Sequence, residues 1–309
     1  MNIKDPISLT ARLTAAARAR ESLRPDRLFD DPLAAALAGS EGFTLMDRLE
    51  MAARPADSTE PLENPYIAMR TRFFDDFLAT AVAESHARQI VLVAAGLDSR
   101  AFRLDWPEGT RFFELDRGEV LRAKQEVLDS LAAAARCDRR VVAVDFLADW
   151  GGALVAAGFD VATPSVCLIE GLFPYLDEAA AGAVVEQSAR LAAPGSHLGA
   201  DVVGRSMLES PWTRAYLAAL ARENSPWLFG TDDPEAFFGV HGWVATAFRP
   251  GDRVVSYGRW PYPVAPRGLP GIPQSFLITA TSQDLGDHER HDTPTPRHHT
   301  RSDLALVCL

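Results

Sequence analysis

The first 85 residues carry apolar positions at helical spacing. The segment TARLTAAARARESL is rich in residues that favour helices. In DDPLAAALAG, Asp31 suits an N-cap, Pro32 the first helical position and Gly39 the helix end. The polar, Pro-containing stretch 50–64 predicts a loop, and a long helix is predicted from about residue 66 to 84. The apolar side of that helix carries Ile67, Phe74, Phe77, Leu78 and Ala81.

From residue 89 the pattern changes to short apolar runs, separated by helical segments such as RGEVLRAKQEVLDSLAAAA and DEAAAGAVVEQSARLAA. Unbroken apolar runs are typical of parallel strands that helices cover on both faces. Strands that alternate with helical segments indicate βαβ units, whose crossovers are right-handed. The pattern therefore predicts an α/β fold with a mostly parallel sheet. The predicted strands are QIVLVAA, TRFFELD, RVVAVD, SVCLIEG, SHLGADVV, WVATAFRP and SFLITATSQ.

After residue 205 the pattern is more mixed. SMLESPWTRAYLAALAREN predicts a helix, and Asp233-Pro234 in TDDPEAFFGVHG marks the start of another. GRWPYPVAPRGLPGIP, between the last two strands, is rich in Pro and Gly and predicts a loop. The tail 283–309 is polar, and its histidines have no predicted fold around them to form a metal site, so we expect disorder there.

Charge and cysteine content restrict the possible functions. The formal charge is -11, which argues against the basic surface that nucleic-acid binding requires. Cys137, Cys167 and Cys308 are far apart and form no C-x-x-C pair, which favours a reducing compartment over a disulfide or zinc framework. The start MNIKDPISLT lacks the apolar run of a signal peptide, and no apolar stretch approaches the ~18 residues of a membrane span. We therefore expect a cytoplasmic protein that uses no metal and binds neither nucleic acid nor membrane.

The first predicted strand ends in VLVAAGLDSR, where an apolar run breaks at a single glycine and charged residues follow. Ligands of open α/β sheets bind outside the carboxyl ends of the strands. Gly96 lies at such an end, where a glycine lets the backbone approach a ligand closely, although many strands end in glycine without any ligand. The dinucleotide fingerprint G-x-G-x-x-G is absent, and LDSRAFRLDWP is too short and mixed to predict a phosphate-binding helix.

Three successive predicted strands place an acid at their carboxyl ends. Asp116 lies 20 residues after Gly96, a spacing that suits hydrogen bonds from ribose hydroxyls. Asp145, followed by Phe146, ends the third strand, and Glu170 ends the fourth. Any one of these acids is as well suited to cap the next helix. Three at one edge predict a pocket for a ligand that has a ribose and a cationic group.

The motifs VLVAAGLDSRAFRL, FFELDRGEV, VVAVDF and IEGLFPYL carry a resemblance to a known family. In order and spacing they resemble S-adenosylmethionine-dependent methyltransferases of the leucine carboxyl methyltransferase-like family, especially the bacterial, actinobacterial-type branch that includes polyketide O-methyltransferases. TAAARARESLRPDRLFDDPLA and MRTRFFDDFL resemble the same branch, so the resemblance runs from about residue 8 to 282. It implies a Rossmann-like class I methyltransferase fold with seven strands, a late antiparallel strand SFLITATSQ and an N-terminal helical cap. Ala94 and Ala95 stand where common methyltransferases carry glycines.

The resemblance implies an S-adenosylmethionine pocket and a role for each matched residue. Gly96 would lie against the methionine part of the cofactor, and Asp116 would hold the ribose hydroxyls. Asp145 and Phe146 would flank the adenine. Glu170 would lie near the amino group or the sulfonium.

An arginine in the stretch MRTR would bind the cofactor carboxylate, and Arg70 matches the family better than Arg72. A guanidinium pairs bidentately with a carboxylate, so the chemistry agrees with this role. The alternative is a solvated helix face on which these arginines pair with Asp75 and Asp76, which lie three and four residues after Arg72.

The acceptor pocket is expected between the N-terminal helices and an insert at about 205–240. A carboxylate acceptor is already a nucleophile, whereas a phenol is helped by a base. His241 in GVHGW is a candidate base, although a structural role is the commoner outcome for such a histidine. Tyr175 in GLFPYL is expected either to line the pocket or to pack. Aromatic residues of the insert favour an aromatic or polyketide-like acceptor unless they belong to the core: Trp212, Tyr216, Trp227, Phe229, Phe237 and Phe238.

We therefore expect an S-adenosylmethionine-dependent O-methyltransferase of a small carboxylate or hydroxyl acceptor. A nicotinamide-dependent oxidoreductase would explain Gly96 and Asp116 but not Asp145 or Glu170. A cofactor-binding protein without activity is the third hypothesis. The expected organisation is a cap at 1–85, a cofactor-binding domain at 86–282 that contains the insert, and the tail 283–309.

Overall fold

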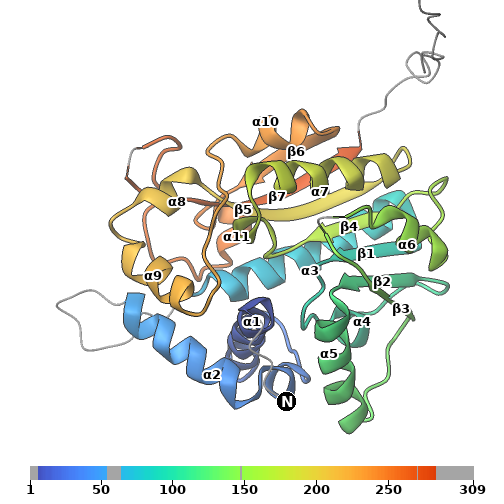
Figure 1. Cartoon of the computed structure of the whole chain (residues 1–309), viewed down its shortest axis with the longest axis horizontal. Helices are drawn as coiled ribbons and strands as arrows, with labels where there is room; N and C mark the ends of the chain where they lie inside the picture. Colours follow the sequence, from blue (N-terminus) through green and yellow to red (C-terminus); the bar gives the residue numbers. More distant parts are fainter. Residues whose placement is uncertain (1–5, 54–63, 147, 270, 283–309) are drawn as a thin grey trace, which may run out of the picture.

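The computed structural model describes residues 6–53, 64–146, 148–269 and 271–282. Its centre is a seven-stranded sheet with the strand order β3-β2-β1-β4-β5-β7-β6 (Figure 1). Each predicted strand forms. The strands are β1 (Gln89–Val93), β2 (Arg111–Asp116), β3 (Asp138–Ala143), β4 (Val166–Ile169), β5 (His197–Val203), β6 (Trp243–Phe248) and β7 (Ser275–Ser282).

Strand directions follow the prediction. β3, β2, β1, β4 and β5 pair in parallel, and β7 runs antiparallel to both of its neighbours, β5 and β6. The carboxyl ends of the five parallel strands therefore lie at one edge of the sheet, which is where α/β folds bind ligands. The connection from β6 to β7 returns at this same edge, because Val203 at the end of β5 pairs with Ser275 at the start of β7.

Helices cover both faces of the sheet (Figure 1). The longer ones include those that the sequence pattern predicts, and several short ones join them. They are α1 (Pro6–Ser22), α2 (Ala34–Ala53), α3 (Tyr66–Ser85), α4 (Arg100–Arg103), α5 (Gly118–Ser130), α6 (Gly151–Ala156), the 3₁₀ turn η1 (Phe173–Tyr175), α7 (Glu178–Leu191), α8 (Arg205–Glu209), α9 (Arg214–Arg222), α10 (Pro234–Gly239) and α11 (Arg253–Ser256).

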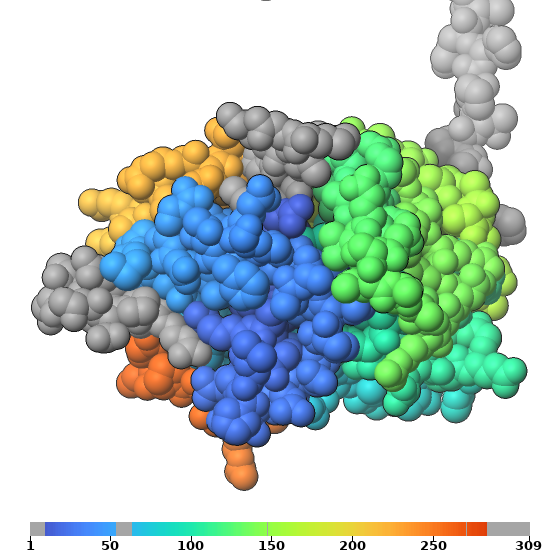
Figure 2. All heavy atoms as spheres, turned by 90° about the horizontal axis from the view of Figure 1, so that it is seen from below, coloured from blue at the N-terminus to red at the C-terminus, as the bar shows by residue number. Residues whose placement is uncertain are grey.

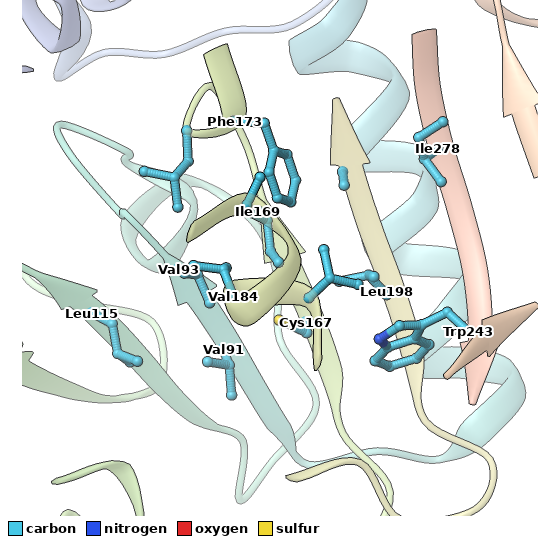
Figure 3. Packing of buried hydrophobic residues seen from close by; sticks show 14 of the residues in the cluster. Val91, Val93, Leu115, Cys167, Ile169, Phe173, Val184, Leu198, Trp243 and Ile278 are labelled. Carbon is cyan, nitrogen blue, oxygen red and sulfur yellow. The ribbon is translucent and has the colours of Figure 1, made fainter. Parts of the chain in front are cut away.

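Alternate residues of each buried strand enter different cores. Val91 and Val93 pack toward α6, α7 and α10, in the cluster that Figure 3 shows around Val184. Ile90 and Leu92 pack on the opposite face, against α3, α4 and α5. Side chains of a strand point alternately to the two faces, so a strand that helices cover on both sides must be apolar throughout. This is the physical reason for the unbroken apolar runs in the sequence.

The N-terminal helices α1 and α2 pack against each other and lie over the carboxyl edge of the sheet. Gly42 allows their close approach, because a Cβ there would stand 2.5 Å from the carbonyl oxygen of Arg12. Leu97, just after β1, joins the apolar cluster of α1 and α2. Figure 2 shows these helices, in blue, between the yellow α8–α9 region and the green segment that follows β2. The predicted N-terminal cap is confirmed as a structural feature.

The structure corrects three local predictions. Residues 50–53 belong to α2 and not to a loop, while 54–63 lie outside the described residues. The single helix expected in SMLESPWTRAYLAALAREN is two, α8 and α9, because the chain leaves the helix before Pro211. LDSRAFR does form a short helix, α4.

The tail 283–309, for which disorder was predicted, lies outside the described residues. Among the described residues, no helix is both long and apolar enough to cross a membrane.

Candidate cofactor and acceptor site

A cavity of about 1040 Å³ opens at the carboxyl edge of the sheet. Small-molecule sites usually measure ~300–1,000 Å³, so this space lies at the upper end of that range and is large enough for more than one small ligand. Its walls come from α1, α2 and α3, from the ends of β1, β2, β4 and β5, from the α8–α9 region, and from the connection 249–274. Sequence segments that lie far apart therefore meet at one site.

Gly96 and Asp116 form one end of the cavity. Gly96 has a φ of 49°, a left-handed conformation that favours glycine. Its N–H donates to Oδ2 of Asp116 at 2.7 Å, and the N–H of Arg117 donates to Oδ1 at 2.7 Å. Burial raises the pKa of Asp116, whereas these two hydrogen bonds oppose the shift. A carboxylate accepts about four hydrogen bonds, so Asp116 keeps capacity for a ligand hydroxyl.

Helix α1 lies directly over the Gly96 loop. Arg18 donates to the carbonyl oxygen of Leu97 at 2.7 Å and to Asp31 at 2.8 Å. The hydroxyl of Ser99 donates to the same carboxylate at 2.6 Å. The N-terminal region thus holds the loop through buried, charge-assisted hydrogen bonds, which are stronger than neutral ones.

Arg70 of α3 lies in the middle of the cavity wall. Its guanidinium pairs with Glu170 at 2.8 Å and with Asp201 of β5 at 2.7 Å, and it lies 5.7 Å from the centre of the Tyr66 ring. Burial disfavours the charged guanidinium, but the two carboxylates outweigh burial and raise the pKa of Arg70 above its ordinary value. The hydroxyl of Tyr66 donates to Asp201 at 3.3 Å. A charged Arg70 is therefore fixed in the cavity wall between two carboxylates, and its role toward a cofactor carboxylate stays a prediction.

Arg100 is a site residue that the sequence reasoning missed. It is 2% exposed, and its guanidinium donates to Asp75 and Glu170, each at 2.8 Å, and to Asp98. Burial opposes the charge of Glu170, but Arg100 and Arg70 keep the pKa of Glu170 below its usual value. In the sequence, Arg100 looks like an ordinary charged loop residue, because two of its partners, Asp75 and Glu170, come from distant segments.

Asp201 is the second residue that the sequence reasoning missed. Its Oδ1 accepts from the N–H of Gly171 at 2.6 Å, and its other oxygen accepts from Arg70. A signal was available, since Asp201 is an acid inside the apolar run SHLGADVV. A buried acid in a strand requires a partner, which marks it as a position of interest.

Four of the predicted site residues do not line the cavity. Arg72 pairs with Asp76 at 3.0 Å on a half-exposed helix face, as in the alternative interpretation. His241 packs against Gly182 of α7 and lies 5.2 Å from the ring of Phe237, outside the cavity, which supports the structural role over that of a base.

Asp145 is exposed and Phe146 is half-buried, both just beyond β3. β3 is the strand beside β2, and the N–H of Val144 donates to the carbonyl oxygen of Asp116. They therefore lie beyond the Asp116 end, outside the cavity walls, and their role at the adenine stays a prediction. Among the described residues, no group of His, Cys, Asp and Glu is arranged to hold a metal.

The aromatic residues of the insert divide into two groups. Trp212, Tyr216 and Trp227 line the cavity, and the rings of Tyr216 and Trp227 are 5.8 Å apart. Tyr175 of η1 also lines it. The others, Phe229, Phe237 and Phe238, belong to the apolar core around α7 and α10.

Comparisons with known proteins agree with this geometry. Residues 11–189 match the leucine carboxyl methyltransferase family. A protein of Frankia alni, named "Putative S-adenosyl-L-methionine-dependent methyltransferase", is 43% identical over 255 residues, covering 81% of this chain and 87% of its own. A protein of Streptomyces coelicolor with the same description is 39% identical over 290 residues, covering 87% and 92%.

A solved structure shares the fold at low sequence identity. The crystal structure of a DUF574 family protein from Streptomyces avermitilis superposes with a TM-score of 0.59 at 15% identity, covering 89% of this chain and 97% of its own. The family match spans the cap, the Gly96 loop, Asp116 and Glu170. The chain therefore belongs to the leucine carboxyl methyltransferase family and is an S-adenosylmethionine-dependent methyltransferase.

Proposed function

We propose that this enzyme methylates an oxygen atom, carboxylate or hydroxyl, of a small acceptor molecule in secondary metabolism, with a polyketide-like compound as the model acceptor. S-adenosylmethionine would supply an electrophilic methyl group, whose carbon bonds to the acceptor oxygen as its bond to sulfur breaks and S-adenosylhomocysteine leaves. The chain's own residues would bind and orient the two reacting molecules and exclude water from them. These contributions are large in a displacement between two bound molecules. The reducing compartment that the cysteines indicate makes the cytoplasm its proposed location.

The cofactor assignment follows the order of the strands. Asp116 at β2 would accept the ribose hydroxyls, Gly96 at β1 would lie against the methionine part, and Glu170 at β4 would lie near the amino group and sulfonium. Arg70 would pair with the cofactor carboxylate. Asp145 and Phe146, beyond Asp116, would flank the adenine.

The observation that supports oxygen methylation is the pair of tyrosine hydroxyls in the cavity wall, those of Tyr175 and Tyr216. Burial raises the pKa of both groups, which outweighs the opposing effect of Arg70. Both hydroxyls therefore stay protonated and are able to donate hydrogen bonds. They would donate to an acceptor oxygen, whereas an ammonium offers them no lone pair.

No base is required for a carboxylate acceptor. His241, which lies outside the cavity, takes no part in the proposal. For a hydroxyl acceptor, a base would help. The experiment must therefore distinguish an ester product from an ether product.

The first measurement is isothermal titration with S-adenosylhomocysteine, for the wild type and for Asp116→Ala. We expect a loss of at least about tenfold in affinity, or ~1.4 kcal/mol, in the variant. Asp105→Ala is the matched control, because Asp105 is 95% exposed and pairs only with Arg136 at the surface. NADH should not bind, and NADH binding in place of S-adenosylhomocysteine would revive the oxidoreductase hypothesis.

The second measurement identifies the methylated atom. The enzyme is incubated with radiolabelled S-adenosylmethionine and panels of aromatic carboxylic acids, phenols and amines. Methyl esters release methanol in mild base, whereas methyl ethers do not. Labelling of amines alone would refute oxygen methylation. A protein that binds S-adenosylhomocysteine but labels no member of any panel would favour the hypothesis of an inactive cofactor-binding protein.

A further inference from the structure

The connection between β6 and β7 is much longer than its topology requires. The two strands are antiparallel neighbours, and such pairs are usually joined by about two to five residues. Here the connection spans residues 249–274, of which the described part includes only one short helix, α11. Long loops of this kind are uncommon in compact domains and are usually functional. The sequence reasoning identified the loop but gave it no role.

This connection is held firmly to the fold. Arg249 donates to the carbonyl oxygen of Ala265 at 2.8 Å. Arg267 pairs with both oxygens of Glu235 at 2.8 and 3.0 Å, and it donates to the carbonyl oxygen of Ala247. These bonds join the loop to the end of β6 and to α10. A loop that is anchored in this way presents its side chains at fixed positions.

The loop places an aromatic wall in the cavity. Trp260 and Tyr262 both line it, with ring centres 5.3 Å apart. Gly251 packs directly against this wall. A Cβ on it would lie 2.8 Å from Cδ1 of Trp260 and 2.4 Å from a methyl carbon of Val264. Only a hydrogen atom fits between them. Gly251 does not have a positive φ, so the requirement for glycine is one of space alone.

The connection leaves the sheet far from the predicted cofactor end. Asp116 ends β2, whereas the connection leaves from β6 and enters β7. In the strand order, β1, β4 and β5 stand between β2 and β7. Four strand spacings of ~4.8 Å therefore separate the ends of β2 and β7 by about 19 Å. A ligand at the end of β7 would accordingly be a second one, distinct from a ligand at Asp116.

Exposed apolar side chains continue the wall outward. Tyr262 is 47% exposed and Trp212, from the α8–α9 region, is 78% exposed, yet both line the cavity. Large exposed apolar groups around a pocket mark a binding surface for apolar matter. They would have no partner if the acceptor were a small polar acid.

We propose that the acceptor carries an extended apolar body, and that Trp260, seated on Gly251, is the specificity-determining residue that sets the length of body accepted. This inference rests on the proposed function, because it takes the reacting oxygen to lie beside Tyr175 and Arg70. The acceptor class is then an amphiphilic phenol or acid whose chain or ring system reaches the loop 249–274.

A series of 4-alkylphenols of increasing chain length measures how long an apolar body the cavity accepts. Affinity is measured by equilibrium dialysis for the wild type saturated with S-adenosylhomocysteine. Each added methylene should increase the affinity about fourfold until the chain meets the wall, after which the affinity should stop rising. Trp260→Ala should move this limit to longer chains. Gly251→Ala should change the limit although the indole is still present, because the new Cβ displaces Trp260 and Val264.

Gly152→Ala is the matched control, since Gly152 lies in α6 and a Cβ there meets no atom within 4 Å. It should keep the wild-type limit, and all three variants should bind S-adenosylhomocysteine as the wild type does, which also confirms that they fold. An affinity independent of chain length in the wild type, or an unchanged limit in both Trp260→Ala and Gly251→Ala, would overturn the proposal. Failure of the wild type to bind S-adenosylhomocysteine would instead refute the proposed function, and the same alkylphenol series measured without S-adenosylhomocysteine would still report on the loop.

Discussion

The two ends of the cavity are built in different ways. The Gly96–Asp116 end is made of strand ends and buried ion pairs, in which Arg18, Arg70 and Arg100 each contact carboxylates or backbone oxygens. The Trp260 end is made of loops and half-exposed rings, with few charges facing inward. The first arrangement fixes polar groups at defined positions, which suits one invariant ligand. The second offers apolar area whose shape depends on loop length, which suits a ligand that varies between related enzymes.

The largest expected effect comes from breaking the ion pairs of the first end. Arg100→Met leaves the carboxylates of Asp75, Asp98 and Glu170 without their common cation. Removal of one partner from a buried pair costs ~3–5 kcal/mol of unfolding free energy. Chemical denaturation measures this loss. Arg136→Met, which removes only the exposed pair with Asp105, should change the unfolding free energy by less than ~1 kcal/mol.

The next largest effect is a difference in cofactor affinity between variants of Arg70 and of Arg72. Arg70→Met should weaken S-adenosylhomocysteine binding by about tenfold or more, because a charge-assisted hydrogen bond contributes ~1.5–3 kcal/mol. Arg72→Met should leave the affinity unchanged, since its guanidinium pairs with Asp76 outside the cavity. Isothermal titration of both variants tests the comparison. Equal losses in the two would contradict the placement of the cofactor carboxylate beside Arg70.

A pH dependence tests how the cap is held to the Gly96 loop. Burial opposes ionisation of Asp31, but Arg18, Ser99 and Arg103 hold its pKa below the ordinary value of 3.8. A carboxyl group whose pKa is lower in the folded state stabilises the fold above pH 3.8, and this stabilisation is lost as the pH falls through the lower value. Melting temperatures of the wild type should therefore fall more steeply below about pH 4 than those of Asp31→Asn. If the melting temperatures of the two proteins fell in parallel with pH, the ionised Asp31 would not contribute to the stability of the fold.

The smallest effect is expected at His241. His241→Ala removes a ring that packs on Gly182 and Phe237, outside the cavity. Methyl transfer should proceed at the wild-type rate once an acceptor is known, with a modest loss of stability of ~1 kcal/mol. A large fall in kcat with unchanged S-adenosylhomocysteine affinity would restore the histidine as a base.

Most of the cofactor end was predictable from the sequence because it follows from chain order. Apolar runs that alternate with helical segments predict parallel strands, and parallel strands bring their carboxyl ends to one edge. Gly96, Asp116 and Glu170 each end such a strand, so the sequence places them together without knowledge of the packing. Arg70 was predicted from the resemblance, and the structure brings it against Glu170.

The acceptor end was less predictable because its residues meet only through tertiary packing. Trp212 and Phe238 look alike in the sequence, yet one lines the cavity and the other lies in the core. The aromatic composition of the insert could not separate them, since burial depends on where each short helix docks. Trp260 lies in a loop without periodicity, so no pattern linked it to a cavity whose other walls come from distant segments.

The sequence by itself determined the strands and the acids at their carboxyl ends, because these depend on local periodicity and on the rules of sheet topology, whereas the antiparallel direction of β7 was implied by the family resemblance. Only the tertiary structure decided which charges pair and where the loop 249–274 lies. Arg100 and Asp201 are single charged residues in the sequence, and they become site residues because burial forces each to find partners from distant segments. The packing of Trp260 on Gly251 likewise depends on the absence of a Cβ at Gly251. The sequence pattern does not show that these two residues come into contact.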